Sequence, residues 1–447
     1  MNRRRVRRVS AIASGSTLVV ALGIYLPLTL LAPLIPAGAR VASYTSPDHA
    51  AAALTWPTFG ASAISAIGFP EALASSGTSS PLPIASISKL VTVLVTLEAK
   101  PIAVGENGPT ITFSAADSRL LPKYAAMNGK TEPMKAGSSL TELDLLRVVL
   151  VASANNYAEV LATWGHGSEA AFLSASRAWL KAHGLTHTTI VEPTGINPGN
   201  TSTARDLVTL GKLALDNPVL AAIVSTKSVS LPSVGTFDNT NALLGQYGVD
   251  GVKSGSLGQY GNSLLFSADY HVGGQDVVLI GAVLGATDHK ALYAAVQSLL
   301  STARSGFRQV TLATKGQVFA SYSTPWEHVV KAVAQKDAAT VVWSDTPVSA
   351  KIEPTRDIGP APKGEAVGRV TFTVGTASVS VPLVLQRSIT DPGPWWRLFN
   401  PVPLLQGTYA GMRINAWDTQ PLANRVSPSI ERPLSLPRLG SHLSEVL

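Results

Sequence analysis

The spacing of apolar residues predicts a helical region in the middle of the chain. Apolar positions recur at the helical interval over five stretches: 86–100, 143–152, 156–167, 169–184 and 203–216. A capping-box pattern at 139–142 precedes the second stretch, which we expect to end as a helix near Ser153. Glycine follows the last apolar turn of the third and fourth. The pattern therefore predicts a lobe of several packed helices.

From about residue 225 the period changes from helical to strand-like. Four segments rich in β-branched and apolar residues, separated by Gly, Asn and Pro, lie at 227–234, 248–255, 262–270 and 275–286. A helical pattern then covers 289–303. These segments predict a sheet flanked by helices, so the fold class is α+β.

The remaining residues predict a second, smaller domain and a tail. Residues 307–388 are mostly strand-like, with a helical signal only at 326–334, and after Asp391 the chain is Pro-rich and expected to be irregular. Residues 395–399, WWRLF, could rest on a membrane or pack the tail onto the β domain, and the flanking prolines favour packing. We expect four parts: 1–39, 40–305, 306–390 and 391–447.

The N-terminal segment indicates export. Five arginines lie in residues 1–10, the next 25 residues carry no charge, and Ala37-Gly38-Ala39 is a small-x-small site. The pattern predicts a signal peptide or an uncleaved membrane anchor, and either places the rest of the chain outside the plasma membrane, secreted or anchored to its outer face. The net charge of +7 comes mainly from these arginines, so no nucleic-acid-binding stripe is expected. The chain has no cysteine, which excludes disulfides and thiolate chemistry.

Ser86 and Lys89 form the first candidate for chemistry. At the start of a helix, three residues make about one turn, so the hydroxyl and the amine share one face. A serine hydroxyl needs a neighbour that accepts its proton before it can act as a nucleophile. The free N–H groups at the helix start could also hold an oxyanion. By itself this spacing is also that of an ordinary helix cap.

Two further motifs favour a catalytic role for the Ser86 and Lys89 pair. Ser153-Ala154-Asn155 ends the second predicted helix, and Lys253-Ser254-Gly255 lies on a predicted strand. Order and separation are similar to the S-x-x-K, S-x-N and K-T-G motifs of penicillin-recognising serine acyl-transferases. The flanks PIASISKLVTVLVTLE, LRVVLVASANNYAEVLA, TSTARDLVTLGKLAL and NTNALLGQYGVDGVKSG resemble low-molecular-mass penicillin-binding proteins of the serine-type D-alanyl-D-alanine carboxypeptidase family. The resemblance covers about 80–285 and extends more weakly into the β section.

The resemblance implies a transpeptidase/β-lactamase-like catalytic domain followed by a small all-β domain. It also implies that Ser86 attacks the terminal D-Ala-D-Ala bond of peptidoglycan stem peptides and is acylated by β-lactams. Lys89 would accept the proton, Ser153 would relay a proton to the leaving amine, and Asn155 would hold the substrate amide. No metal or cofactor is implied.

The other residues implied by the resemblance bind the substrate. Lys253 and Ser254 would hold its terminal carboxylate, and Gly255 would let the strand approach it closely. Ser256 would share the oxyanion hole with Ser86 through backbone N–H groups, and Arg205 would lie near the carboxylate end.

The sequence departs from the family pattern at three positions. Ser88 and Ser254 stand where the family has Thr, and Asn156 stands where Asp is common. Two alternatives therefore stay open. A β-lactamase-like hydrolase would use the loop residue Glu192 to activate water, and a non-catalytic wall-binding or scaffolding protein would keep only the fold.

Overall fold

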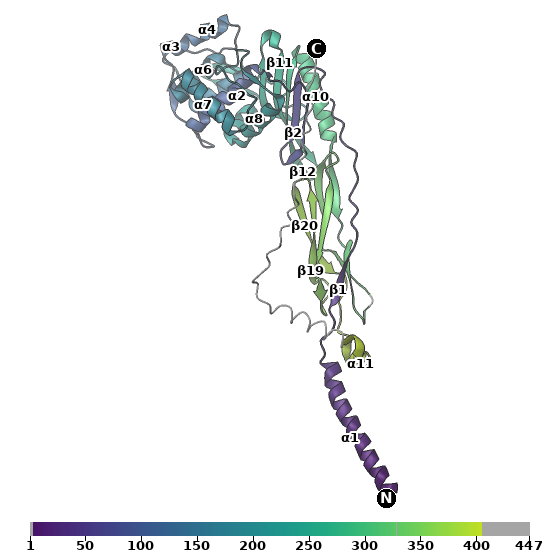
Figure 1. The fold of residues 1–447 in the computed structure, drawn as a ribbon. Helices are drawn as coiled ribbons and strands as arrows, with labels where there is room; N and C mark the ends of the chain where they lie inside the picture. Colours follow the sequence, from purple (N-terminus) through teal and green to yellow (C-terminus); the bar gives the residue numbers. More distant parts are fainter. Residues whose placement is uncertain (1–2, 328, 405–447) are drawn as a thin grey trace, which may run out of the picture.

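The computed structural model describes residues 3–327 and 329–404, so most of the predicted tail, 405–447, lies outside the described residues. The molecule is elongated (Figure 1). A broad domain of helices and strands forms one end, a narrow β domain forms the middle, and the helix α1 (Arg3–Leu30) forms the other end. The predicted α+β architecture is confirmed.

The larger domain is built around an antiparallel five-stranded sheet in the order β10-β11-β12-β2-β3. Its strands are β2 (Ala61–Ala66), β3 (Phe69–Gly77), β10 (Val249–Ser256), β11 (Asn262–Val272) and β12 (Gln275–Ala286). Successive side chains of a strand point to opposite faces. Leu264 and Phe266 therefore pack with α10 (His289–Ser305), whereas Leu265 packs with α8 (Ala204–Asp216).

The predicted helical lobe lies on the α8 side of this sheet. At its centre is α2 (Ser88–Ala99), in which every residue from Ser88 to Leu97 is buried. The helix expected to end near Ser153 is present, but its last turn is a π turn, η2 (Val148–Ala152). Around α2 lie α3 (Ala115–Ser118), α4 (Leu120–Ala126), α5 (Glu142–Arg147), α6 (Asn155–His166), α7 (Glu169–Ala182) and α9 (Pro218–Val224).

Short elements join the lobe to the sheet. A 3₁₀ turn, η1 (Ala85–Ile87), leads into α2, and a second, η3 (Gly258–Tyr260), follows β10. Three short strand pairs complete the domain: β4 (Leu82–Pro83) with β7 (Thr201–Ser202), β5 (Thr110–Thr112) with β6 (Ser139–Thr141), and β8 (Ser228–Leu231) with β9 (Gly235–Asp238).

The β domain contains a seven-stranded sheet in the order β17-β19-β20-β15-β14-β1-β18 and a separate pair, β13 with β16. Its strands are β13 (Phe307–Ala313), β14 (Val318–Ser323), β15 (Val330–Ala334), β16 (Ala338–Trp343), β17 (Val348–Pro354), β18 (Asp357–Ile358), β19 (Ala366–Val374) and β20 (Ala377–Leu385). The helical signal at 326–334 is wrong, because part of it forms β15, whose alternate residues pack in the core of this domain.

One strand of this sheet comes from the N-terminal end of the chain. β1 (Ala37–Val41) pairs with β14 and β18, and Ala39 lies opposite Tyr322. The expected division at residue 39 therefore cuts through a strand. The sequence does not reveal this, because AGARV is short and its partners follow only after the whole larger domain.

The C-terminal end of α1 and the C-terminal end of the described chain meet beside the β domain. α1 continues through Pro27 to Leu30, and the tail forms α11 (Gly393–Phe399), so the tail is not irregular throughout. α11 lies beside the C-terminal end of α1 (Figure 1). Trp396 packs edge-on against Trp326 of the β domain at 5.5 Å, as tail packing predicts, but Trp395 is 73% exposed.

Candidate active site

Ser86 lies in a tightly held turn at the start of α2. Ala85, the residue before it, has a φ of 47°, a left-handed conformation that only surrounding contacts can maintain. Two glycines pack closely against this turn. A Cβ on Gly195 would lie 1.9 Å from the Ala85 carbonyl oxygen, and one on Gly255 would lie 2.6 Å from the Ile84 carbonyl oxygen. No side chain larger than hydrogen fits at either glycine without moving the turn.

Lys89 points from the first turn of α2 to the Ser86 hydroxyl. Its Nζ lies 2.9 Å from Ser86 Oγ, 2.6 Å from Asn155 Oδ1 and 2.7 Å from the Thr194 carbonyl oxygen. The side chain is completely buried. A neutral amine has two N–H donors and one lone pair. When Asn155 and Thr194 accept both N–H groups, the lone pair is left for the Ser86 hydroxyl.

Burial makes this neutral form accessible near neutral pH. Removal from water lowers the pKa of Lys89 to about 7; the Glu192 carboxylate opposes this shift and the Lys130 ammonium adds to it. A base with a pKa near the working pH is efficient in proton transfer. Lys89 is therefore both close enough to Ser86 and suitable in pKa to accept its proton.

Ser153 and Asn155 are positioned by the end of the π turn η2. Ser153 caps η2 with a φ of 64°, and Asn155 begins α6 two residues later. Both side chains line the cavity in front of Ser86, although each residue is only 4% exposed. The Asn155 backbone N–H donates to the Lys130 carbonyl oxygen, which ties this corner to the loop that carries Lys130.

The opposite wall of the cavity is formed by β10. Ser254 Oγ lies 2.7 Å from Thr240 Oγ1, and Lys253 Nζ donates to the same Thr240 oxygen at 3.2 Å. Lys253 is 1% exposed, and burial, followed by the charges of Lys89 and Lys130, lowers its pKa well below the usual value. This wall thus offers hydroxyl donors and a buried amine that a carboxylate would help to protonate.

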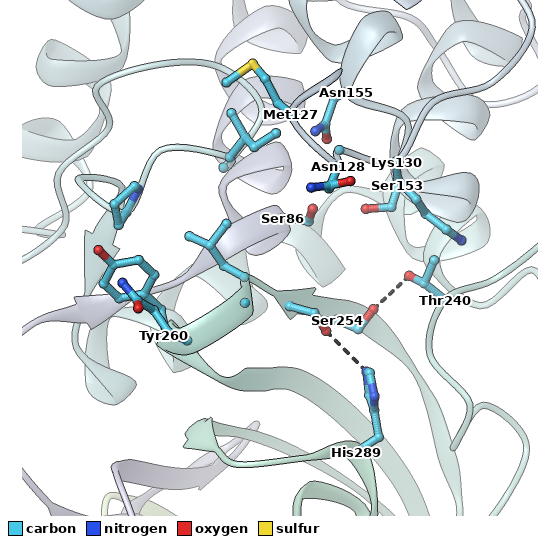
Figure 2. A pocket seen from close by; sticks show the side chains of 18 residues that line it. Ser86, Met127, Asn128, Lys130, Ser153, Asn155, Thr240, Ser254, Tyr260 and His289 are labelled. Carbon is cyan, nitrogen blue, oxygen red and sulfur yellow. Dashed lines mark hydrogen bonds between the residues drawn. The ribbon is translucent and has the colours of Figure 1, made fainter. Parts of the chain in front are cut away.

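The walls enclose a cavity of about 680 Å³ (Figure 2). Ser86, Ser153 and Asn155 face Ser254 and Thr240 across it. The cavity is large enough for a short peptide, because ligand sites commonly measure about 300–1,000 Å³. Its outer wall includes Met127, Asn128, Ile196, Pro198, Tyr260 and His289, and His289 Nε2 lies 3.2 Å from Ser256 Oγ.

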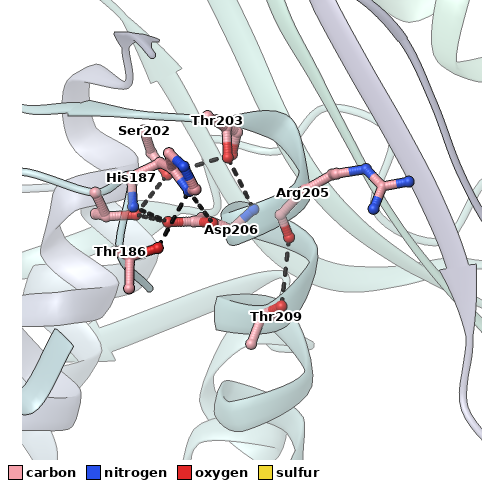
Figure 3. Close-up of polar contacts among 8 residues, drawn as sticks. Thr186, His187, Ser202, Thr203, Arg205, Asp206 and Thr209 are labelled. Atoms are coloured by element: carbon pink, nitrogen blue, oxygen red, sulfur yellow. Dashed lines mark hydrogen bonds and ion pairs between the residues drawn. The ribbon is translucent and has the colours of Figure 1, made fainter. Parts of the chain in front are cut away.

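Five predicted site residues line this cavity: Ser86, Ser153, Asn155, Ser254 and Ser256. Lys89 and Lys253 hydrogen-bond to residues that line it, and Gly255 lies between two of them on β10. Arg205 is placed elsewhere. It lies in the first turn of α8, where its Nε donates to Ser75 Oγ at 2.9 Å, and it lines a different hollow together with His187. Figure 3 shows its guanidinium directed away from the His187 and Asp206 side chains. The first turn of α8 faces β3 rather than β10, which explains the correction.

Glu192, the residue considered for water activation, closes its own loop. Its two carboxylate oxygens accept hydrogen bonds from the Thr194 and Gly195 backbone N–H groups, from Thr194 Oγ1, and more weakly from Asn197 N–H and Asn200 Nδ2. Glu192 does not line the cavity in front of Ser86. The carboxylate therefore orients the Thr194 carbonyl toward Lys89, which does not favour a role in activating water.

Sequence reasoning missed four groups around the site. Thr194 contributes a backbone carbonyl, which no side-chain motif can reveal. Lys130 and Thr240 come from loops without periodicity, and His289 comes from the first turn of α10, where it resembles an ordinary helix-start residue. Of these four groups, only Thr240 lies in a segment that resembles the family, NTNALLGQYG.

Two solved penicillin-binding proteins have a similar fold. The chain aligns with PBP3 of Streptococcus pneumoniae at a TM-score of 0.54 and 22% identity, covering 75% of this chain and all of that one. It aligns with penicillin-binding protein 5 of Haemophilus influenzae at 0.51 and 22%, covering 78% of this chain and all of that one. The protein is thus of the penicillin-recognising fold, and its site is a serine with a buried lysine.

The family follows from the sequence matches. Residues 71–288 match the family described as D-alanyl-D-alanine carboxypeptidase, and this part of the chain belongs to that family. The chain is 27% identical to the D-alanyl-D-alanine carboxypeptidase DacC of Escherichia coli K12 over 279 residues, 60% of this chain and 68% of that protein. It is 30% identical to a D-alanyl-D-alanine endopeptidase of Pseudomonas aeruginosa over 216 residues, 45% of this chain and 64% of that protein.

Proposed function

We propose that this protein is a serine-type D-alanyl-D-alanine carboxypeptidase that removes the terminal D-alanine from peptidoglycan stem peptides through an acyl-enzyme on Ser86, and that β-lactams acylate the same serine. The observation that carries the proposal is the 2.9 Å contact between Ser86 Oγ and a completely buried Lys89 amine. A buried lysine with a lowered pKa beside a serine is an arrangement suited to nucleophilic catalysis.

In the acylation step, Ser86 Oγ attacks the carbonyl carbon of the penultimate D-alanine while its proton passes to Lys89 Nζ. The backbone N–H groups of Ser86 and Ser256 donate to the tetrahedral oxyanion. Such preorganised donors stabilise the oxyanion more than they stabilise the carbonyl oxygen of the ground state. The C–N bond then breaks, and Ser153 passes a proton from Lys89 to the leaving amine. D-alanine departs and the peptide remains as an ester of Ser86.

In the deacylation step, water attacks the ester carbonyl and gives a proton to Lys89. The bond between the carbonyl carbon and Ser86 Oγ breaks, and the oxygen regains its proton from Lys89. Asn155 keeps the substrate amide in place, and its Oδ1 also fixes the Lys89 amine at 2.6 Å. No other base is required, because one lysine serves both steps.

The terminal carboxylate is bound on the β10 wall. Ser254 and Thr240 offer hydroxyl groups 2.7 Å apart, and Lys253 Nζ lies directly behind them. Ser254 keeps the hydroxyl of the usual Thr and loses only a methyl group. Ser88 is buried and donates to the Ala85 carbonyl, so its exchange for Thr changes packing behind the site rather than the reacting groups.

We place the catalytic domain outside the plasma membrane, where peptidoglycan lies. Among the described residues, the one helix long and apolar enough to cross a membrane is at the N-terminus, Arg8–Leu30. The arginines before it favour an inside location for this end. The substrate partner is therefore the cell wall.

The test uses the full chain in detergent with a fluorescent penicillin and with diacetyl-L-lysyl-D-Ala-D-Ala. Ser86→Ala should lose both labelling and D-alanine release. Ser75→Ala, which removes an exposed hydroxyl bonded to Arg205 outside the cavity, should retain both.

The outcomes separate the three functions. Stable labelling together with D-alanine release supports the carboxypeptidase. Rapid hydrolysis of penicillin without a stable adduct would indicate a β-lactamase. If the wild-type chain gave neither labelling nor release, the fold would serve as a scaffold and the proposal would be wrong.

A further inference from the structure

Lys130 is the only lysine or arginine among the described residues that lines the cavity of Figure 2. Its side chain is exposed, whereas Lys89 and Lys253 are buried behind the cavity walls. Figure 2 shows this side chain directed past Ser153 to the side of the cavity that carries Thr240. No described aspartate or glutamate lines the cavity. The cavity therefore presents one accessible lysine ammonium and no carboxylate to a substrate.

Two buried amines show that the charge of Lys130 reaches the interior of the site. Burial is the main cause of the lowered pKa of both Lys89 and Lys253, and the Lys130 ammonium lowers both pKa values further. Lys253 Nζ donates to Thr240 Oγ1 at 3.2 Å, so the wall beyond Thr240 is within reach of this charge. Three amines therefore surround the cavity. A carboxylate bound between them would relieve their mutual repulsion.

The loop that carries Lys130 is fastened to the start of α6. The Lys130 carbonyl oxygen accepts a hydrogen bond from the Asn155 backbone N–H at 2.8 Å. The Tyr157 hydroxyl donates to the Pro133 carbonyl oxygen at 2.6 Å. A Cβ on Gly129 would lie 2.4 Å from Asn155 Nδ2, so the loop also packs directly on that amide. The backbone of Lys130 is thus held in a fixed place relative to the reacting groups.

Asn156, one of the departures from the family pattern, is central to this attachment. Its Nδ2 donates to the Glu132 carbonyl oxygen at 2.9 Å, and its Oδ1 accepts from the Glu132 backbone N–H at 3.2 Å. An ionised aspartate has no hydrogen to donate, so it could make only the second bond. Burial raises the pKa of the Glu132 carboxyl and the Lys130 charge opposes this rise, but within the described chain the Lys130 ammonium has no hydrogen bond or ion pair. The ammonium is therefore available to a ligand.

From these contacts we propose that Lys130 binds the terminal carboxylate of the stem peptide, together with the hydroxyl groups of Ser254 and Thr240. This inference rests on the proposed carboxypeptidase function and adds the residue that selects a free C-terminus. The resemblance implied a cation from Arg205 at this end of the site, but Arg205 lines another hollow. Lys130 supplies the cation instead, from the wall that carries Ser153. A peptide that continues beyond the second D-alanine, or that ends in an amide, has no charge here and loses this contact.

The test compares diacetyl-L-lysyl-D-Ala-D-Ala with the same peptide ending in a carboxamide. Release of D-alanine or D-alaninamide by the full chain in detergent is measured at about pH 8.5, well above the pKa of about 7 of Lys89, so that its protonation changes little between variants. Lys130→Met removes the charge and Lys130→Arg keeps it. The matched control is Lys135→Met, which changes an exposed lysine of the same loop that does not line the cavity. Thermal unfolding of each sample checks that the variants are equally folded.

We expect the wild type to prefer the carboxylate peptide, and Lys130→Met to lose about 10- to 100-fold in kcat/KM for that peptide, mainly through KM, with little change for the carboxamide. Lys130→Arg and Lys135→Met should keep the wild-type preference. Equal losses with both peptides in Lys130→Met, or an unchanged preference, would overturn the inference and leave the carboxypeptidase in place. So would a preference that disappears only in His289→Gln, because the imidazole would then be the contact. If the wild type released nothing from either peptide, the proposed function and this inference would both be wrong.

Discussion

Replacing Gly195 by Ala should displace Ser86 by a predictable amount. The new Cβ would lie 1.9 Å from the Ala85 carbonyl oxygen and 2.8 Å from the Ser86 backbone nitrogen, both rigid backbone atoms. The turn must therefore retreat by about 1 Å to reach even the shortest tolerated contact. A misplacement of about 1 Å in a reacting group costs on the order of 100-fold in rate.

Gly184→Ala is the matched control. Gly184 has a φ of 72°, close to the 85° of Gly195, but a Cβ there would meet nothing within 4 Å. Both variants carry the cost of a left-handed alanine, about 1–2 kcal/mol, and only Gly195→Ala disturbs the serine. Each kcal/mol lowers the melting temperature by about 2–4 °C in a domain of this size.

The assay is the second-order rate of acylation by a fluorescent penicillin, with thermal unfolding measured on the same samples. We expect Gly184→Ala to melt a few degrees lower and to acylate at the wild-type rate. Gly195→Ala should remain folded at 20 °C and acylate about 100-fold more slowly. A folded Gly195→Ala that acylates as fast as Gly184→Ala would show that this glycine does not set the position of Ser86.

Three other predictions concern charge. The acylation rate should rise with pH around pH 7 as Lys89 loses its proton. Glu192→Gln removes a charge that raises this pKa, so the midpoint of the profile should move to lower pH. Asn197→Ala, a neutral change in the same loop at an exposed side chain bonded to Gly199 N–H, should leave the midpoint unmoved, and identical midpoints in Glu192→Gln and wild type would count against the assignment. Burial raises the pKa of Glu142 from 4.5 to about 7, so between these pH values the folded chain holds a proton that the unfolded chain has lost, and the melting temperature should fall as pH rises from about 5 to about 7. Calorimetry should find a smaller fall in Glu142→Gln, and an equal fall in this variant would assign the effect to other groups. Arg205→Ala should leave kcat/KM for the diacetyl peptide unchanged, because its guanidinium bonds outside the cavity; a large loss would return Arg205 to the site.

The sequence predicted the groups whose identity and spacing both carry information. Ser86 and Lys89 lie one turn apart on a helix, and the backbone alone brings their side chains to 2.9 Å. Asn155 and Ser254 were predicted by resemblance, and the structure brings them to the same cavity. Their catalytic roles stay predictions until the variants are measured.

The groups that escaped prediction depend on loops or on backbone atoms. The Thr194 carbonyl reaches Lys89 because Glu192 folds the loop back on itself, and five hydrogen bonds to one carboxylate leave no periodic signal in the sequence. The predicted placement of Arg205 near the carboxylate end of the site differs from the structure for another reason. A motif flank predicted its neighbourhood, but the direction of its side chain depends on how α8 crosses the sheet.

The β domain was predicted as a separate unit, and its first strand was not. Alternation of apolar residues reveals strands such as β19, where Val370 and Phe372 are buried. β1 has no such alternation, and its pairing is set only by the register against Ser321 and Tyr322. Pairings across long sequence separations depend on the whole fold and cannot be read from a five-residue segment.

The pairing of β1 with β14 also sets an order of events during biosynthesis. Ala37–Val41 is made early, yet its partners at Val318–Ser323 and Asp357–Ile358 are made only after the whole larger domain. The larger domain can therefore form its sheet and helical lobe while β1 is still unpaired, and long-range pairing of this kind is slow. The entropic cost of closing so long a loop is only a little greater than that of a shorter one, because this cost grows with the logarithm of loop length. Once β1 has paired, the segments before and after the larger domain are held in the same seven-stranded sheet, and a chain that stops before β14 cannot reach this state.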